Sequence, residues 1–326
     1  MNMDSQVAYE GKTMKGPFAK AIVELGNEND KIVALTADLG KYTDLYPFKE
    51  AFPERYFQIG MAEQNLFGVA GGMARTGLIP YVTTYGVFAT RRANEQLAID
   101  INYGRANVKI VCGLPGLTTF AGPTHQAIED LAILRSMPGM TILDPCDAVE
   151  LYQATKAIAE FDGPVYMRLQ RGEVPVFFDE NSYKFELGRA KVLNSDGEDL
   201  LIISLGLMTR HAFEAVLALE KEGIKATLVH VSTLKPFDTE TILEQLYKSR
   251  AVVTCENHTV MGGLGSCVAE MAALHGAPIV LRMVGVQDVY ATCGSTPFLF
   301  KRYGLDSATI VEHSREVLHA KEKFVS

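Results

Sequence analysis

The feature that most restricts the fold of this chain is a regular alternation of short apolar runs with longer amphipathic segments. In the first half, the apolar runs have the length and composition of buried strands, and they lie at 31–39, 78–85, 107–114, 139–145 and 164–169. Segments such as 15–28 and 148–161 have the periodicity of helices. Strands that alternate with helices are typical of parallel sheets, so an α/β domain is predicted.

The alternation stops at residues 173–200 and then resumes. This segment is polar and rich in turn residues, so we expect a hairpin and a domain boundary within it. Beyond it, strand-like runs again alternate with helical segments, at 200–206, 225–231, 250–257 and 278–285. The sequence therefore predicts two α/β domains with parallel or mixed sheets, namely 1–180 and 196–326, joined by a linker at 181–195.

Composition excludes several classes of protein. The 326 residues carry a net charge of −8, which argues against binding to nucleic acid or to an anionic membrane. No apolar run reaches the roughly 18 residues of a membrane span, and the polar start MNMDSQVAYEGK has no signal-peptide core. The five cysteines are far apart and form no Cys-x-x-Cys pair. A reduced, cytoplasmic setting is expected.

One carboxylate, Glu63, stands in the nearly uncharged stretch RYFQIGMAEQNLFGVAGGMA (55–74). The small residues after it, including Gly68 and Gly71, indicate a buried and closely packed helix. A buried carboxylate costs free energy unless it is paired or hydrogen-bonded. Glu63 therefore interacts with the helix dipole or another partner inside the chain, or it accepts a hydrogen bond from a nitrogen heterocycle that binds there.

Further candidates lie where predicted strands end. Tyr85, Phe88 and Arg91 are spaced by three, which would place them on one helix face, either in the core or against a ligand. His125 follows a loop rich in Gly, Pro and Thr, and Arg171 follows the run 164–169. The carboxyl ends of parallel strands are where such sheets bind ligands.

Other motifs are weaker or missing. Arg171 could bind phosphate or pair with Glu173, and the turn GGLGS (262–266) could bind an anion or only permit close packing. The sequence has no P-loop and no Gly-Asp-Gly motif followed by a distant Asn. It also lacks a His/Cys/Asp cluster with metal spacing, so we predict no metal ligand in this chain.

Taken in order, these segments resemble the C-terminal part of a transketolase across essentially the whole chain. The matching segments are ADL (37–39), RYFQIGMAEQN (55–65), the Tyr85/Phe88 segment, GPTHQAIEDLAILRSMPGMTILDP (122–145), RLQRG (168–172) and VVTCENHTVMGGLGS (252–266). The resemblance implies a pyrimidine-binding domain at 1–180 and a transketolase C-terminal domain at 196–326. The family's diphosphate-binding domain has no counterpart, so the chain resembles the second subunit of a split transketolase.

The resemblance also implies roles for residues that would contact thiamine diphosphate. The acid that matches Glu63 accepts a hydrogen bond from N1′ of the aminopyrimidine, which would satisfy the buried carboxylate. Phe88 matches the residue that stacks on this ring, with Tyr85 beside it. Asp38 and Leu39 match positions near the cofactor.

For the substrate, the resemblance implies that His125 contacts oxygen atoms and assists proton transfer, so that Glu63 and His125 are the catalytic pair. Arg171 would bind the substrate phosphate, and Arg91 would add positive charge where transketolases often have an aromatic residue. One departure is Ala121, since family members commonly carry Asp at this position. The lost hydrogen bond is worth about 1–3 kcal/mol of discrimination. This favours a donor or acceptor other than the usual linear sugar phosphates, such as a branched or modified ketose.

The expected activity is transfer of a two-carbon glycolaldehyde unit from a ketose, usually phosphorylated, to an aldose. The expected assembly is a heterotetramer with two copies of this chain and two diphosphate-binding subunits, which would supply most contacts to Mg²⁺ or Ca²⁺. Deoxyxylulose-phosphate synthase, which is normally one long chain, and the beta subunit of a 2-oxoacid dehydrogenase E1 remain alternatives. A non-catalytic partner subunit is a further alternative from a different class.

Overall fold

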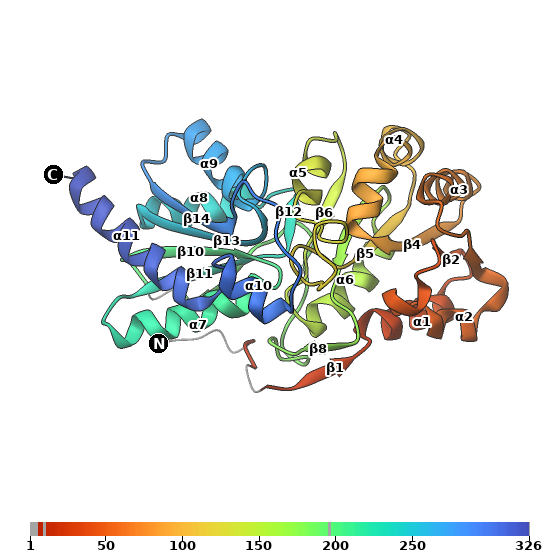
Figure 1. Ribbon diagram of the computed structural model, residues 1–326, viewed down its shortest axis with the longest axis horizontal. Helices are drawn as coiled ribbons and strands as arrows, with labels where there is room; N and C mark the ends of the chain where they lie inside the picture. Colours follow the sequence, from red (N-terminus) through yellow and green to blue (C-terminus); the bar gives the residue numbers. More distant parts are fainter. Residues whose placement is uncertain (1–5, 9–10, 195–196, 326) are drawn as a thin grey trace.

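The protein is built around two sheets that lie next to each other, each with helices on both faces (Figure 1). The computed structural model describes residues 6–8, 11–194 and 197–325. The predicted α/β class with two mixed sheets is confirmed. The separation at 181–195 stays a prediction, and residues 1–5, 9–10, 195–196 and 326 of the predicted ranges lie outside the described residues.

The first sheet has seven strands, and all its pairings except one are parallel. Its strands are β2 (Ile32–Thr36), β3 (Tyr56–Gln58), β4 (Ile79–Tyr85), β5 (Lys109–Gly113), β6 (Thr141–Leu143), β7 (Val165–Leu169) and β12 (Thr233–Lys235). Their spatial order is β12-β6-β7-β5-β4-β2-β3. The exception is β12, which comes from the second half of the chain and pairs antiparallel with β6.

Two groups of helices cover this sheet (Figure 1). One face carries α1 (Pro17–Glu28), α2 (Tyr46–Ala51) and α6 (Ala148–Glu160). The other carries α3 (Glu63–Arg75), the π-helical turn η3 (Phe88–Arg92), α4 (Asn94–Gln96), the π-helical segment η4 (Leu97–Tyr103) and α5 (Asp130–Arg135). Two short 3₁₀ turns, η1 (Gly40–Thr43) and η2 (Pro53–Arg55), flank α2.

The second sheet has five strands in the order β14-β13-β10-β11-β9. They are β9 (Lys191–Asn194), β10 (Leu200–Leu205), β11 (Ala226–Val231), β13 (Ala251–Thr259) and β14 (Val280–Val286), and β9 alone is antiparallel among these pairings. The helices around it are α7 (Met208–Lys221), α8 (Thr239–Lys248), α9 (Leu264–His275), α10 (Thr296–Arg302) and α11 (Ser307–Val325).

The predicted hairpin within 173–200 is wrong. The strand β8 (Glu173–Pro175) pairs antiparallel with β1 (Thr13–Lys15), near the start of the chain, and β9 pairs with β11. The polar, turn-rich composition of this segment marked an irregular connection, but it carried no information about distant pairing partners.

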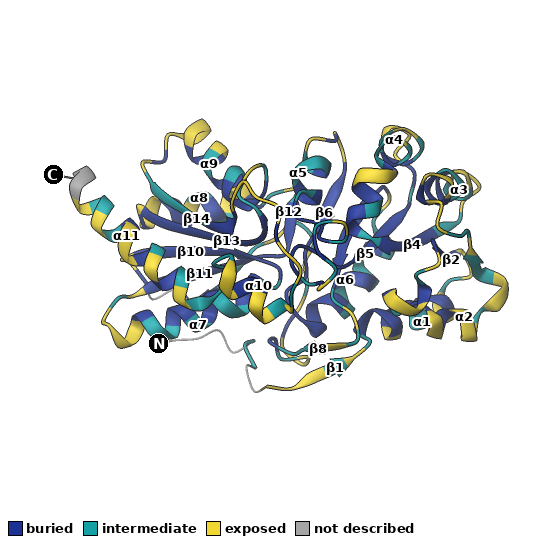
Figure 2. Ribbon diagram, in the orientation of Figure 1, coloured by how far each residue is buried: buried dark blue, intermediate teal, exposed yellow. Residues whose placement is uncertain are grey.

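The two sheets share one apolar core. A single cluster of buried side chains includes Leu66 and Phe67 of α3, Ile203 of β10, and Leu264 and Val268 of α9. Both sheets are accordingly buried, and exposed residues are concentrated on the outer helices (Figure 2). Burial of a continuous apolar surface fixes the two halves relative to each other. No helix in the described part of the chain is long and apolar enough to cross a membrane.

Candidate active site

The candidate residues all lie at, or shortly after, the carboxyl ends of neighbouring strands of the first sheet. The strands lead to them as follows: β2 to Asp38 and Leu39, β3 to Glu63, β4 to Tyr85, Phe88 and Arg91, β5 to His125, and β7 to Arg171. In open parallel sheets this edge is where ligands bind, because the loops there converge. The fold therefore brings residues that are far apart in sequence to one edge.

Glu63 is the first residue of α3, and its side chain is only 1% exposed. Its carboxylate has partners inside the chain. Nη1 of Arg92 donates to Oε2 at 2.8 Å, and the Thr84 hydroxyl donates to Oε1 at 3.3 Å. The Arg92 side chain is 50% exposed, so the buried acid is paired with a group that solvent can also reach.

The expected close packing of α3 is confirmed at Gly71. A Cβ atom on this residue would lie 2.6 Å from the backbone oxygen of Asp100 in η4. Any side chain would therefore force α3 away from η4. Separately, the Arg92 ion pair joins Glu63, at the start of α3, to η3.

Three rings meet beside Glu63's helix. The ring centroids of Phe88 and His125 are 5.3 Å apart at an interplanar angle of 70°, and Tyr85 lies 5.8 Å from Phe88 and 6.0 Å from His125. Edge-to-face geometry at this distance is favourable for aromatic pairs. Burial raises the pKa of Tyr85, and the charge of Arg171 acts in the opposite direction. Arg171 therefore lies within electrostatic reach of this cluster.

The expected helix face of Tyr85, Phe88 and Arg91 is wrong at Tyr85, which is the last residue of β4, whereas Phe88 and Arg91 both lie in η3. Arg91 has partners outside η3. Its guanidinium pairs with Glu129, donates to the Pro123 carbonyl at 3.0 Å and lies 5.8 Å from the ring centroid of Tyr290. Arg91 thus ties η3 to the loop that carries His125. Its charge is countered by Glu129.

Arg92 is the functional candidate that sequence reasoning missed. It lies over Phe88, with 4.6 Å between the guanidinium carbon and the ring centroid, while it also pairs with Glu63. The sequence feature that could have indicated Arg92 is its spacing of four from Phe88, because side chains four residues apart are neighbours on a helix.

Asp38 lies in a preformed turn after β2. Its φ angle is +58°, in the left-handed region that residues other than glycine rarely adopt. Two hydrogen bonds hold it there: its N–H donates to Gln58 Oε1 at 2.7 Å, and Gln58 Nε2 donates to its carboxylate at 2.8 Å. Leu39 follows as a half-buried residue. The ends of β2 and β3 are therefore locked together.

The loop with His125 rests against the second half of the chain. Gly122 has a φ of +78°, and a Cβ atom on it would lie 2.6 Å from the sulfur of Cys293. Gln126 Nε2 donates to the Thr292 carbonyl at 3.1 Å. Ala121, the departure noted in the sequence, is half-buried at the start of this turn. Residues after β14 therefore support the loop that carries His125.

The glycine turn before α9 binds an acid of its own chain. Glu256, fully buried, accepts hydrogen bonds from the N–H groups of Leu264 at 2.8 Å and Gly265 at 2.9 Å. A Cβ atom on Gly263 would meet this carboxylate at 1.8 Å. The sequence left anion binding and close packing open, and the turn combines both by enclosing Glu256.

Glu256 leads to a pH prediction. Burial raises its pKa to about 7. Between pH 4.5 and 7 the unfolded chain would have lost this proton while the folded chain keeps it, so the group makes the unfolding free energy fall as pH rises. At about 1.4 kcal/mol per pH unit, Glu256 lowers the unfolding free energy by about 3 kcal/mol over this range. The unfolding free energy of Glu256→Gln, taken relative to that of the wild type, should therefore rise by about 3 kcal/mol between pH 4.5 and 7.5.

Urea unfolding at several pH values measures this difference. His258, whose pKa burial lowers to about 4, gives a slope of the opposite sign between pH 4 and 6.5, so only the difference from the wild type isolates Glu256. The exposed Glu180→Gln is the matched control and should show no such trend. A pH-independent difference for Glu256→Gln would contradict the prediction.

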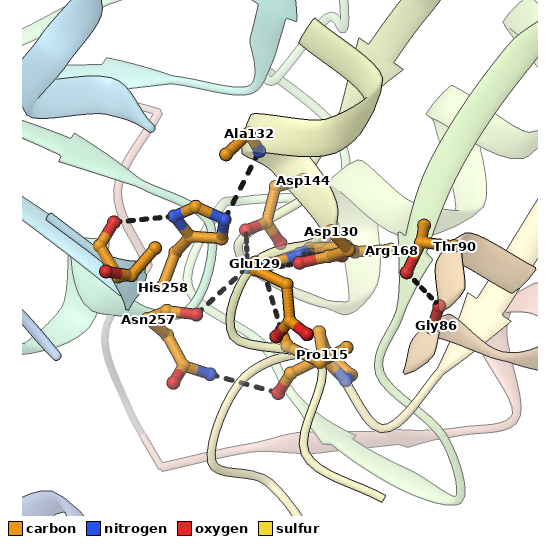
Figure 3. A network of polar contacts seen from close by, with 12 residues as sticks. Gly86, Thr90, Pro115, Glu129, Asp130, Ala132, Asp144, Arg168, Asn257 and His258 are labelled. Carbon is orange, nitrogen blue, oxygen red and sulfur yellow. Dashed lines mark hydrogen bonds and ion pairs between the residues drawn. The ribbon is translucent and has the colours of Figure 1, made fainter. Parts of the chain in front are cut away.

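A buried charge network joins β7 to α5 and β13 (Figure 3). Arg168 in β7 is 1% exposed, and it donates to Asp130 through Nε at 2.9 Å and Nη2 at 2.5 Å, and to Asp144 through Nη1 at 2.9 Å. It also donates to the carbonyls of Ala127 at 3.3 Å and Asn257 at 3.1 Å. All the donors of a guanidinium are therefore used. Because Asn257 belongs to β13, the network joins both halves.

A second buried network contains three residues of metal-ligand type. Ligand atoms of Cys146, Glu150 and His230 lie within 4.8 Å of one another, which sequence spacing could not show. Glu150 accepts from His230 Nε2 at 2.9 Å, from the Cys146 N–H at 2.8 Å and from the Tyr183 hydroxyl. These groups are hydrogen-bonding partners for one another, so the arrangement is that of a hydrogen-bonded network in the core.

Comparisons with known proteins cover most of the chain. The family profile "Transketolase, pyrimidine binding domain" matches residues 10–176, and "Transketolase, C-terminal domain" matches residues 188–310. A relative described as "Putative uncharacterized transketolase family protein y4mN", from Sinorhizobium fredii, is 50% identical over 308 residues, which cover 94% of this chain and 89% of the relative.

Two further similarities extend over nearly full lengths. The "6-deoxy-6-sulfo-D-fructose transketolase subunit SqwH" of a Clostridium species is 38% identical over 98% of this chain and 99% of its own length. A solved structure described as "Split gene transketolase, inactive beta4 tetramer" is 44% identical, with a TM-score of 0.87, and the match covers 95% of this chain and 99% of that one.

Proposed function

Because the chain belongs to the transketolase family and carries its pyrimidine-binding and C-terminal domains, we propose that it is one subunit of a split, thiamine-diphosphate-dependent transketolase. The proposed reaction moves a two-carbon glycolaldehyde unit from a ketose to an aldose. The observation that carries this proposal is the buried carboxylate of Glu63 at the carboxyl edge of the first sheet, next to Phe88 and His125.

The residues at this edge fit the pyrimidine half of the cofactor. Glu63 offers a buried acceptor whose charged partner, Arg92, is half exposed. Phe88 offers an aromatic face, and Asp38 and Leu39 lie in the neighbouring turn. When bound, thiamine diphosphate supplies an electron sink for the bond that is broken. Glu63 would hold a proton at the ring nitrogen that it contacts, and the low dielectric around it strengthens that bond.

The substrate would meet His125 and Arg171. His125 packs against Phe88, so an imidazole that can donate or accept a proton lies next to the proposed cofactor ring. Arg171 is exposed, and a guanidinium is suited to a phosphate or another tetrahedral anion. We propose that it binds the charged end of the sugar. Arg91, held by Glu129 and Pro123, would position the His125 loop and contribute less directly.

A second subunit is proposed to complete the site. The described residues include no Gly-Asp-Gly motif, so we propose that a diphosphate-binding subunit supplies most contacts to Mg²⁺ or Ca²⁺. A tetramer with two copies of each subunit would complete the sites. The similar solved structure is described as an inactive tetramer of one subunit type, which supports a requirement for a second subunit here too.

The sugar is proposed to be non-standard. Ala121 lacks the side chain with which an Asp would bind a substrate hydroxyl. A relative that is similar over its full length is described as acting on 6-deoxy-6-sulfo-D-fructose. Both facts support a modified or branched ketose, whose anionic end Arg171 would bind.

Isothermal titration tests the proposal. Thiamine diphosphate with Mg²⁺ is titrated into this chain alone and into its mixture with a diphosphate-binding subunit. Tight binding is expected only in the mixture, because this chain holds only the pyrimidine half of the site. Tight binding to the chain alone would overturn the split-site proposal, and no binding in either case would favour a non-catalytic subunit.

A substrate panel on the same mixture separates the activities. Xylulose 5-phosphate with ribose 5-phosphate represents ordinary transketolase substrates, and 6-deoxy-6-sulfofructose represents a modified ketose. Release of CO₂ from pyruvate would instead indicate a deoxyxylulose-phosphate synthase or a 2-oxoacid dehydrogenase. Full activity on the ordinary pair would contradict the proposed shift in specificity.

A further inference from the structure

Arg92 contacts the two residues that are proposed to hold the cofactor's pyrimidine ring. Its Nη1 atom lies 2.8 Å from Glu63 Oε2, and its guanidinium carbon lies 4.6 Å from the centroid of Phe88. It follows Phe88 by four residues in η3, whereas Glu63 belongs to α3, so Arg92 joins two neighbouring elements.

The chemistry of a guanidinium resembles that of an aminopyrimidine at these two contacts. The guanidinium is planar, carries N–H donors in its plane and packs its face on aromatic rings. An aminopyrimidine is also planar, can present an N–H group in its plane and has faces that pack on aromatic rings. Arg92 therefore provides Glu63 with a donor and Phe88 with a flat face, as the proposed cofactor ring would.

The two partners of the ion pair differ in their freedom to move. Glu63 is 1% exposed and anchored at the start of α3, whereas the Arg92 side chain is 50% exposed. Rotation of Arg92 into solvent would leave Oε2 free, with Thr84 still bonded to Oε1. An unpaired buried charge is unfavourable, so Arg92 stabilises the subunit for as long as no other donor reaches Glu63.

We propose that Arg92 is an internal substitute for the cofactor's pyrimidine ring. It neutralises Glu63 in the free subunit, and it has to leave when the ring enters, which lowers the affinity for thiamine diphosphate. This inference rests on the proposed function. If Arg92 covers the carboxylate in about nine of ten molecules, its removal tightens binding about tenfold.

The test compares Arg92→Met, Arg92→Lys and Arg75→Met. Arg75 is an exposed arginine at the other end of α3 and serves as the matched control. Titration of thiamine diphosphate with Mg²⁺ into the reconstituted complex should give about tenfold tighter binding for Arg92→Met. Arg92→Lys, which keeps the charge without the planar group, should lie between Arg92→Met and the wild type. Arg75→Met should bind like the wild type.

Thermal unfolding of the free subunit provides a readout without cofactor. Arg92→Met should lower the unfolding midpoint, and it should lower it far less in a Glu63→Gln background, because the charge that Arg92 neutralises is then absent. Arg75→Met should lower the midpoint equally in both backgrounds.

The outcomes separate the two proposals. Equal or weaker cofactor binding by Arg92→Met, with normal binding by the wild type, overturns the role of Arg92 and leaves the proposed function intact. Absence of binding by the wild-type complex overturns the proposed function, and with it the role of Arg92. Equal effects of Arg92→Met in both backgrounds would show that the ion pair does not stabilise the free subunit, which also overturns the inference.

Discussion

Replacement of Glu63 by glutamine is expected to lower kcat of the reconstituted enzyme about a thousandfold. Glutamine has the size of glutamate, but its neutral amide cannot stabilise a positive charge on the ring nitrogen that Glu63 is proposed to contact. Proton transfer by a positioned side chain contributes about 10²–10⁴ to enzymatic rates, which sets the expected size of the loss. Steady-state kinetics of the complex, with saturating cofactor, measures it.

The interpretation depends on an intact fold. Glu63→Gln still accepts a hydrogen bond from Arg92, so the subunit should keep its circular dichroism spectrum. The exposed Glu180→Gln serves as a control for loss of an acid and should retain wild-type kinetics. Full activity of Glu63→Gln would remove the central support for the proposed catalytic role and favour a non-catalytic subunit.

The second large effect is expected for stability. Arg168→Met should lower the unfolding free energy by about 3–5 kcal/mol at pH 7, because Asp130 and Asp144 would remain buried without their counterion. Urea unfolding measures the loss. The loss should be smaller at pH 5, because carboxyl groups that lose a cationic partner bind protons more readily.

Two further variants control for the volume of the side chain. Arg168→Met combined with Asp130→Asn and Asp144→Asn should recover part of the loss, since no unpaired charge is then buried. Arg315→Met removes a half-exposed arginine whose partner, Glu222, is also exposed, and it should cost less than about 1 kcal/mol. If Arg168→Met lowered the unfolding free energy by less than about 1 kcal/mol, the network would not be important for stability.

Much of the site was predictable because strand ends are marked in the sequence. Apolar runs such as 78–85 and 107–114 end in Gly- or aromatic-rich segments, and parallel strands bring those ends to one edge. Tyr85, Phe88 and His125 were therefore candidates before any contact was known, and they do meet.

The choice between neighbouring arginines was not predictable from α-helical spacing. Hydrogen bonds in the π-helical turn η3 reach the fifth residue, which widens the turn. Arg92, the fourth residue after Phe88, lies over its ring, whereas Arg91, the third, pairs with Glu129. Only the backbone geometry decides which guanidinium reaches Glu63.

Contacts between the two halves were also beyond sequence reasoning. Asp130 and Asn257 meet at Arg168, although neither residue follows a recognisable spacing. A buried arginine such as Arg168, within the apolar run 164–169, does indicate that partners exist, because arginine is almost never fully buried unpaired. It does not indicate which residues they are.

The crossing of β12 into the first sheet affects how the chain folds during synthesis. Strand β6 remains without its outer neighbour until Lys235 has been translated, long after β7 is complete. At about 5–20 residues per second, the ribosome would leave that strand edge open for several seconds. An unpaired edge is a template for wrong pairing with other chains. The nascent first half is therefore open to wrong pairing at β6 during this interval.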